Sequence, residues 1–127
     1  MGETYVYAFI RQDLSLEDQM VQLGHACLEA GQAFYRPASG LKSDAEGLGE
    51  GAPDVANLIV FGVADFIQLE RARMKMQAND IRHHAFFEPD PGADGASKGW
   101  TAFATEPVTG ERRKVFRNYK LWKASAV

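Results

Sequence analysis

The alternation of apolar and polar residues predicts four strands and two helices in this chain. Residues 4–11 are rich in β-branched and aromatic side chains, which indicates a strand that is buried on both faces. Residues 57–63 form a continuous apolar run that is typical of a central strand. Residues 81–88 and 100–106 predict a third and a fourth strand, and Pro107 ends the last of them.

Between the first two strands, apolar residues recur every three or four positions, which predicts a helix from residue 16 to about residue 35. Ser15 is placed to cap its N-terminus, with Asp18 three residues later. Pro37 disfavours helical geometry in the residue before it and ends the helix. The apolar stripe expected to face the core consists of Leu16, Met20, Leu23, Cys27, Ala30 and Phe34.

A second helix is predicted to begin at Asp65, which is a good N-cap with Gln68 three residues later, and to end at Asn79, which tolerates a left-handed C-terminal conformation. Residues 37–54 are rich in glycine and proline and have no usable period, so we expect a mobile loop. Residues 89–95 predict a second loop. The expected core stripe of the second helix is Phe66, Leu69, Ala72 and Met76.

This order of elements predicts a single α/β domain with a four-stranded mixed sheet. The helical crossovers favour parallel strands with right-handed connections, whereas the short link before the fourth strand favours an antiparallel return. The tail after Pro107 is expected to contain turns and one short helical segment.

Composition restricts the class of protein. A chain of 127 residues with 46% apolar residues has the size and composition of one globular domain. The longest apolar runs are about eight residues, whereas a membrane-spanning helix needs about twenty, and the first residues lack the pattern of a secretory signal. The lone cysteine, Cys27, is consistent with a reducing compartment, so we expect a cytoplasmic protein.

The net charge of −3 conceals a strongly uneven distribution along the chain. Residues 111–123 carry +5, and the other 114 residues carry −8. Aromatic residues stand at every third position of this basic segment, an arrangement that suits phosphate contacts with bases stacked on rings. Equally, the rings can hold the segment on the domain while the cations stay in solvent. The basic residues are Arg112, Arg113, Lys114, Arg117, Lys120 and Lys123, and the aromatic residues are Phe116, Tyr119 and Trp122.

Two groups of polar residues are candidates for chemistry near strand ends. Arg11 and Asp13 follow the first strand, where open α/β sheets place their ligand sites, although the two side chains can also simply pair. On the first helix, a polar stripe either contributes to a site or is a solvated face with a contact between its histidine and its glutamate. That stripe consists of Gln22, His25 and Glu29.

Glu88 and Asp90 follow the third strand, and two carboxylates there can orient a water molecule or form part of an ordinary turn. His83 and His84 are adjacent in a strand and point to opposite faces, which disfavours a joint metal site.

Two short motifs, 9–14 (Phe-Ile-Arg-Gln-Asp-Leu) and 22–26 (Gln-Leu-Gly-His-Ala), together with the order of elements, resemble the type 2 peptidyl-tRNA hydrolase superfamily over nearly the whole chain. The resemblance implies a mixed sheet with helices on both faces and a homodimer. It also implies hydrolysis of the ester between a peptide and tRNA without a metal or other cofactor. Members carry a lysine between the two motifs, where this chain has the acidic stretch 15–19.

On this interpretation, Glu88 or Asp90 orients water, Arg11 or Lys98 stabilises the oxyanion and Thr101 donates a hydrogen bond. Asp13, Gln22 and His25 are supporting residues, and tRNA contacts Arg112, Arg113, Lys114, Arg117 and Lys120. The alternative is a non-catalytic module of the same fold that binds RNA or a protein.

Overall fold

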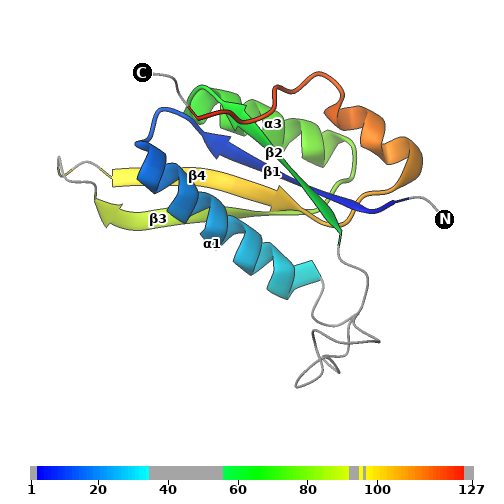
Figure 1. The fold of residues 1–127 in the computed structure, drawn as a ribbon, viewed down its shortest axis with the longest axis horizontal. Coiled ribbons are helices and arrows are strands. Elements are labelled where there is room, and N and C mark those ends of the chain that lie inside the picture. Colours follow the sequence, from blue (N-terminus) through cyan, green and yellow to red (C-terminus); the bar gives the residue numbers. More distant parts are fainter. Residues whose placement is uncertain (1–2, 35–55, 92–94, 96, 125–127) are drawn as a thin grey trace.

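The predicted strands and helices are present in the computed structural model, which describes residues 3–34, 56–91, 95 and 97–124 (Figure 1). The loop predicted at 37–54 lies outside the described residues. The described elements are β1 (Tyr5–Arg11), α1 (Leu16–Phe34), β2 (Asn57–Val63), α3 (Phe66–Ala78), β3 (His83–Pro91), β4 (Ser97–Thr105) and the 3₁₀ helix η1 (Gly110–Phe116).

The four strands form one mixed sheet in the order β2-β1-β4-β3. Strand β1 is parallel to β2, and β4 is antiparallel to both of its neighbours, β1 and β3. Strands β1, β2 and β3 therefore run in the same direction, and their carboxyl ends meet at one edge of the sheet. The domain is a single α/β unit, as the order of elements predicts.

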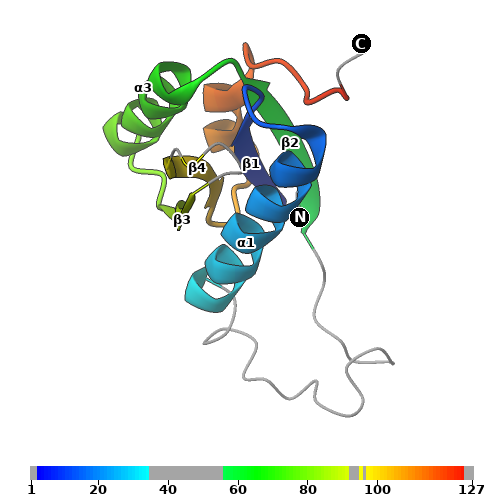
Figure 2. The ribbon, with the colours of Figure 1, turned by 90° about the vertical axis from the view of Figure 1, so that its left-hand side faces the viewer.

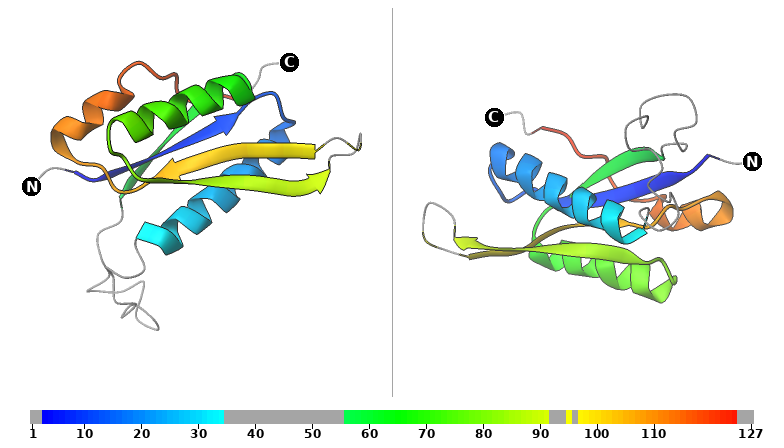
Figure 3. Two further views of the ribbon diagram at one scale, coloured as in Figure 1. Left: turned by 180° about the vertical axis from the view of Figure 1, so that it is seen from behind. Right: turned by 90° about the horizontal axis from the view of Figure 1, so that it is seen from below.

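Helices cover both faces of the sheet. Helix α3 and η1 pack on one face and α1 on the other (Figures 2 and 3). The face under α3 and η1 is aromatic, with Phe9 and Phe103 stacked at 4.5 Å between ring centroids. The face under α1 is lined by the small residues Ala8, Ala102 and Ala104, which let the helix lie close to the strands.

Helix α1 turns a different face to the sheet from the one that its apolar spacing predicts. Of the predicted stripe, Leu16 and Met20 are exposed, and Met20 is 64% exposed. The helix is rotated because two glutamines point inward, where distant elements supply hydrogen-bond partners for them. Apolar spacing does not reveal such partners, so the stripe prediction is wrong in the first turns. The buried residues are Gln19, Gln22, Ala26 and Ala30.

Strand β2 is an outer strand, so the prediction of a central strand at 57–63 is wrong. Its free side is partly covered by the C-terminal segment, here residues 117–124. The N–H of Trp122 donates to the carbonyl of Val60 (2.8 Å), and the N–H of Gly62 donates to that of Lys120 (3.2 Å). A Cβ on Gly62 would collide with the Gln12 side chain, which crosses this strand to reach the carbonyl of Lys123. This additional pairing, together with the packed faces, accounts for the apolar sequence of an outer strand.

The N-terminal cap of α3 is the predicted one, whereas its C-terminal end differs from the prediction. Asp65 accepts a hydrogen bond from the N–H of Gln68, as predicted. At the other end, Asn79 is not left-handed, and the positive φ of 55° belongs to Asp80 instead. The predicted core residue Phe66 is exposed because it lies in the first turn, beyond the edge of the aromatic core.

The last two strands extend further toward their connecting loop than predicted. Pairing of β3 with β4 continues past a register shift to Pro91 and Ser97, where the sequence predicts loop. Gly99, with a φ of +67°, lies between the register shifts and has a backbone conformation that favours glycine. Strand β3 thus runs from His83 to Pro91, whereas the sequence predicts a strand over 81–88, and its last part contains two prolines.

Glu106, just after β4, is a buried carboxylate held by two arginines. Burial raises its pKa, but the backbone N–H of Arg82 and the side chains of Arg112 and Arg82 outweigh burial and lower the pKa overall. The lowered pKa means that ionised Glu106 stabilises the fold above its unfolded pKa, and that this contribution is lost as the pH falls through the folded pKa.

We therefore expect Glu106→Gln to lower the free energy of unfolding by about 1–2 kcal/mol at pH 7. The difference from the wild type should begin to shrink as the pH falls below the unfolded pKa of about 4, and it should be lost as the pH falls through the lower folded pKa. Urea unfolding at several pH values measures both quantities. Glu111→Gln is the matched control, because Glu111 forms an exposed ion pair with Lys114 and should change stability by less than about 0.5 kcal/mol. A constant difference between wild type and Glu106→Gln across the pH range would contradict the assignment.

Candidate functional site

The candidate site lies at the edge of the sheet where β1 and β3 end and β4 begins, on the face covered by α1. The resemblance and the position of the strand ends both point to this edge. Arg11 ends β1, Glu88 stands near the end of β3, and Thr101 and Lys98 come from the first half of β4. Gln22, in α1, packs over them.

Gln22 connects three of these elements through its side-chain amide. Its Nε2 donates to Oε1 of Glu88 (2.8 Å), and its Oε1 accepts from the hydroxyl of Thr101 (2.9 Å). Gln22 is 2% exposed and Thr101 is fully buried, so the bond between them is shielded from water, whereas the bond to Glu88 is only partly buried. The Thr101 hydroxyl is thus directed inward, and the expected hydrogen bond from Thr101 to a substrate does not fit this geometry. Thr101 positions Gln22, and Gln22 positions Glu88.

The Glu88 carboxylate is held as an anion. The hydrogen bond from Gln22 lowers its pKa most, the N–H of Asp90 at 3.0 Å from Oε2 adds to the effect, and burial opposes it. The positive charge of Lys98 and the nearby His25 lower the pKa further. Each carboxylate oxygen has two lone pairs, and each accepts one of these hydrogen bonds, so Glu88 keeps acceptor sites for a water molecule.

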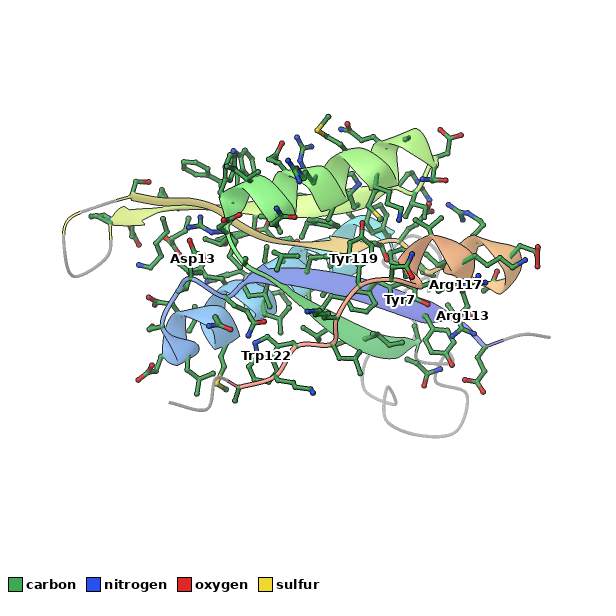
Figure 4. All side chains as sticks on the ribbon, turned by 90° about the horizontal axis from the view of Figure 1, so that it is seen from above. Tyr7, Asp13, Arg113, Arg117, Tyr119 and Trp122 are labelled. Carbon is green, nitrogen blue, oxygen red and sulfur yellow. The ribbon has the colours of Figure 1, made fainter. Side chains whose placement is uncertain are left out.

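Arg11 is a clamp between the ends of β1 and β4. Its guanidinium forms two hydrogen bonds with the Asp13 carboxylate (2.9 and 2.8 Å), and its Nη1 donates to the carbonyls of Lys98 (2.7 Å) and Trp100 (3.0 Å). Four donors are therefore used within the protein. The expected role of Arg11 as oxyanion donor does not fit this arrangement, whereas pairing with Asp13 does. Figure 4 labels Asp13 at this end of the sheet.

Lys98 supplies the positive charge of the site. Its side chain is 15% exposed, and its Nζ lies 3.8 Å from Oδ2 of Asp18, beyond hydrogen-bond distance. Among the residues that the structure describes, no acceptor lies within hydrogen-bond distance of this ammonium. Lys98 and Glu88 come from the adjacent strands β4 and β3, and the charge of Lys98 acts on the Glu88 carboxylate. The site therefore contains one anion and one cation.

The other predicted polar residues also gather around β3, although not with the predicted partners. His25 stacks on the ring of Phe86 at 4.6 Å between centroids, and Glu29 bonds His84 (2.7 Å) rather than His25. The expected contact between His25 and Glu29 is therefore wrong, because β3 lies against this side of α1, although His25 itself is exposed. Asp90 is exposed and contributes its backbone N–H to Glu88.

His83 and His84 point to opposite faces of the sheet, as predicted. His83 packs near Phe103 on the face covered by α3, and His84 meets α1. Within 3–34, 56–91, 95 and 97–124, no group of three or more histidine, cysteine, aspartate and glutamate residues is arranged to hold a metal ion. No helix in those ranges is both long and apolar enough to cross a membrane.

The aromatic residues of the tail pack onto the domain. Phe116 is 3% exposed and stacks on Tyr7 with 3.7 Å between ring centroids. Tyr119 meets the ring of Phe9 edge to face, and Nε1 of Trp122 donates to Oε1 of Gln19 in α1 (2.7 Å). Figure 4 shows the segment running across β2 toward α1. Of the two interpretations of these rings, the structure supports packing, so they do not form a stacking platform for bases.

The basic residues of the tail divide into two groups. Arg112 bonds Glu106, Lys114 pairs with Glu111, and Arg113 bonds the Tyr7 hydroxyl. Arg117 and Lys120 make no ion pair or side-chain hydrogen bond with any described residue. Arg112, Arg113 and Lys114 thus have structural partners, and the role of the whole set in binding tRNA stays a prediction.

Gln22 is the residue on which this geometry depends most. We expect Gln22→Leu to destabilise the fold by about 1–3 kcal/mol, because the buried hydroxyl of Thr101 loses its nearer acceptor and keeps only the carbonyl of Phe86 at 3.5 Å. The pKa of Glu88 should rise, since its main donor is gone, which an NMR titration of the side-chain carboxyl carbon detects.

The control for this substitution is Gln32→Leu, which makes the same change at an exposed position of the same helix. It should leave the pKa of Glu88 unchanged and alter stability by less than about 0.5 kcal/mol. If Gln22→Leu leaves that pKa where it is, Gln22 does not hold the carboxylate as described.

Residues missed by the sequence reasoning are those whose partners are distant in the chain. Gln19 and Trp122 are 103 positions apart and form one hydrogen bond. The only available signal for Gln19 was a polar residue beside an apolar stripe, which is also typical of solvent exposure.

Comparisons with known proteins support the fold and leave the function open. No family model matches the chain, and no curated protein is similar to it at a significant level. A solved structure of a protein of unknown function, Atu0240 from Agrobacterium tumefaciens strain C58, is similar with a TM-score of 0.55 and 16% sequence identity. The similarity covers 97% of this chain and 100% of that one. At this identity the likeness shows a shared α/β fold over essentially the whole chain.

Proposed function

We propose that this protein hydrolyses the ester between a peptidyl or aminoacyl group and tRNA, as a divergent relative of the type 2 peptidyl-tRNA hydrolases. One observation carries the proposal. A carboxylate fixed by two hydrogen bonds, Glu88, is close enough to the mostly buried ammonium of Lys98 for that charge to lower its pKa, and the ammonium itself lies 3.8 Å from Asp18 and within hydrogen-bond reach of no described acceptor. The motif residues Arg11, Asp13 and Gln22 hold the strands and the helix that carry these two groups.

The two groups suit the addition of water to an ester. Glu88 orients a water molecule and takes its proton as the water oxygen bonds to the carbonyl carbon. Lys98 stabilises the oxyanion that forms. When the tetrahedral intermediate collapses, the bond to the ribose oxygen breaks, and that oxygen takes the proton from Glu88. The products are a free carboxyl group and a ribose hydroxyl.

The position of Lys98 also supports the proposal, because this chain lacks the lysine that members of the family carry between the two motifs. The chain has an acidic stretch in place of the family's lysine, and Asp18 belongs to it. Lys98 approaches Asp18 from β4, so a positive charge reaches the start of α1 from another element.

The alternative function, a binding module without catalysis, is favoured by the internal bonding of the motif residues. Arg11 and Thr101 direct their donors to the protein itself. A single-turnover assay separates the two functions. The protein, at a concentration equal to that of peptidyl-tRNA, should release deacylated tRNA faster than the uncatalysed reaction. No release above that background would exclude hydrolysis of this substrate and favour the binding module. The homodimer and the cytoplasmic location stay predictions.

A further inference from the structure

A second polar surface lies on the opposite side of the domain from Gln22, between α3 and the C-terminal segment. It is an open groove of about 480 Å³, within the size range of ligand sites. One wall is α3, with Gln68, Arg71 and Lys75, and the other is the C-terminal segment, with Asn118, Tyr119 and Lys120. The end of β2 forms its floor.

Three cations line this groove, and the described part of its lining contains no carboxylate. Arg71 and Lys75 are four residues apart and so lie on the same side of α3. Across from them, Lys120 comes from the C-terminal segment. Arg71 and Lys120 make no ion pair or side-chain hydrogen bond with any residue in the described ranges. Their charges are therefore available to an external anion.

The two walls are held in place by the fold. The carbonyl of Lys120 accepts a hydrogen bond from Gly62 of β2 (3.2 Å). Between the walls, Tyr119 packs edge to face on Phe9 with 4.8 Å between centroids, and Nζ of Lys75 lies 5.2 Å from the Tyr119 ring centroid. The groove is thus formed before a ligand arrives, which reduces the entropic cost of binding.

We propose that this groove binds a single strand of nucleic acid through its phosphodiester backbone. Regularly spaced phosphates match cations on two facing walls, and the amides of Gln68 and Asn118 add hydrogen-bond donors for phosphate or sugar oxygens. The ring of Tyr119 is half-buried and covered by Lys75, so it is not a platform for bases. Binding is therefore through the backbone and independent of base sequence. Outside the segment 111–123 the chain carries −8 even though this part includes Arg71 and Lys75, so the surface beyond the groove and the tail disfavours contact.

This proposal goes beyond the proposed hydrolysis, because the groove is a separate site and its test measures binding alone. The experiment is fluorescence anisotropy with a labelled 12-nucleotide single-stranded RNA of mixed sequence, titrated with the full chain at several salt concentrations. We expect binding that weakens steeply with salt. The double variant Arg71→Gln/Lys120→Gln should bind about tenfold more weakly at low salt, with a salt slope smaller by about 1.4 because two phosphate contacts are lost.

The matched control is Arg73→Gln/Lys123→Gln, which removes the same two charges from α3 and the C-terminal segment at positions outside the groove lining. It should change the affinity less than about twofold, as expected for charges outside the groove. Equal losses in the two double variants, or no binding at low salt, would overturn the proposal. A melting temperature within about 2 °C of wild type shows that each variant is folded.

Two further binding measurements show whether the phosphates that the groove binds belong to a nucleic acid or to a lipid headgroup. DNA of the same sequence should bind within a few-fold of RNA, because the groove contacts the shared backbone. Vesicles with anionic phospholipid headgroups should not compete, since the groove has no large exposed apolar side chain to insert. Binding to vesicles but not to oligonucleotides would assign the groove to a membrane surface and refute the proposal.

Discussion

Phe116→Ala should lower the free energy of unfolding by about 3–5 kcal/mol, the range for removing a buried aromatic ring. Phe116 lies in η1 but belongs to the aromatic core, where it stacks on Tyr7 and meets Phe61 and Phe9. If the ring served instead as an external platform for bases, its removal would barely affect stability. Chemical denaturation measures the difference.

Phe87→Ala is the control, because Phe87 is 43% exposed and should cost less than about 1 kcal/mol. A second measurement follows the C-terminal segment directly. The amide of Trp122 donates to Val60, so its hydrogen exchange should become faster in Phe116→Ala, since the ring anchors the start of the segment. A small loss of stability with unchanged exchange at Trp122 would show that Phe116 does not hold the segment.

Local sequence features predicted the elements of this fold well. The β-branched run in β1, the Ser15 and Asp65 caps and the antiparallel return of β4 depend on residues within one element or on short links. Such features act over a few residues, so a single sequence reveals them.

What the sequence did not reveal depends on partners that are far apart along the chain. The apolar sequence of β2 predicts a central strand, but β2 has a strand on one side only. On its other side it is bonded by the short C-terminal stretch around Trp122. On α1, the inward side was misassigned because the partners of Gln19 and Gln22 come from the tail, β3 and β4. A buried glutamine with two partners and an exposed glutamine have the same pattern in one sequence.

The candidate site shows the same division. Arg11, Asp13 and Glu88 lie at one edge of the sheet, as expected from the strand ends, and Gln22 and Thr101 bond each other beside Glu88. Their individual roles were not predictable, because each role depends on which donors the fold has already used. Of the two residues named for stabilising the oxyanion, Lys98 is favoured. The donors of Arg11 are engaged within the protein, whereas the ammonium of Lys98 is not hydrogen-bonded to a described acceptor.

Glu88→Gln should reduce the single-turnover rate of peptidyl-tRNA hydrolysis by about 100-fold, the lower range for loss of a group that handles the proton. The substitution is nearly isosteric, and glutamine still accepts the hydrogen bond from Gln22 through its side-chain oxygen, whereas its amide nitrogen cannot accept the bond from the N–H of Asp90. The change therefore removes the charge and the basicity while the scaffold stays in place. Stability should change by less than about 1 kcal/mol, because Glu88 is partly exposed.

Lys98→Met tests the other half of the pair, because methionine keeps the apolar length of the side chain and removes the charge. We expect a rate loss of about 100-fold, comparable to that for removing one oxyanion donor. It should also raise the pKa of Glu88, since the positive charge of Lys98 helps to lower it. A structural role for Lys98 would not produce this shift together with a rate loss in a folded protein.

The matched controls are Glu111→Gln and Arg73→Met, which remove one negative and one positive charge from ion pairs on the face of the sheet opposite Gln22. Both should hydrolyse at the wild-type rate. If the wild type is active and Glu88→Gln is equally active, the carboxylate plays no part in the reaction. If only Lys98→Met retains activity, the oxyanion is stabilised by another group and Lys98 serves to tune Glu88, which would appear as a shifted pH profile with an unchanged maximal rate.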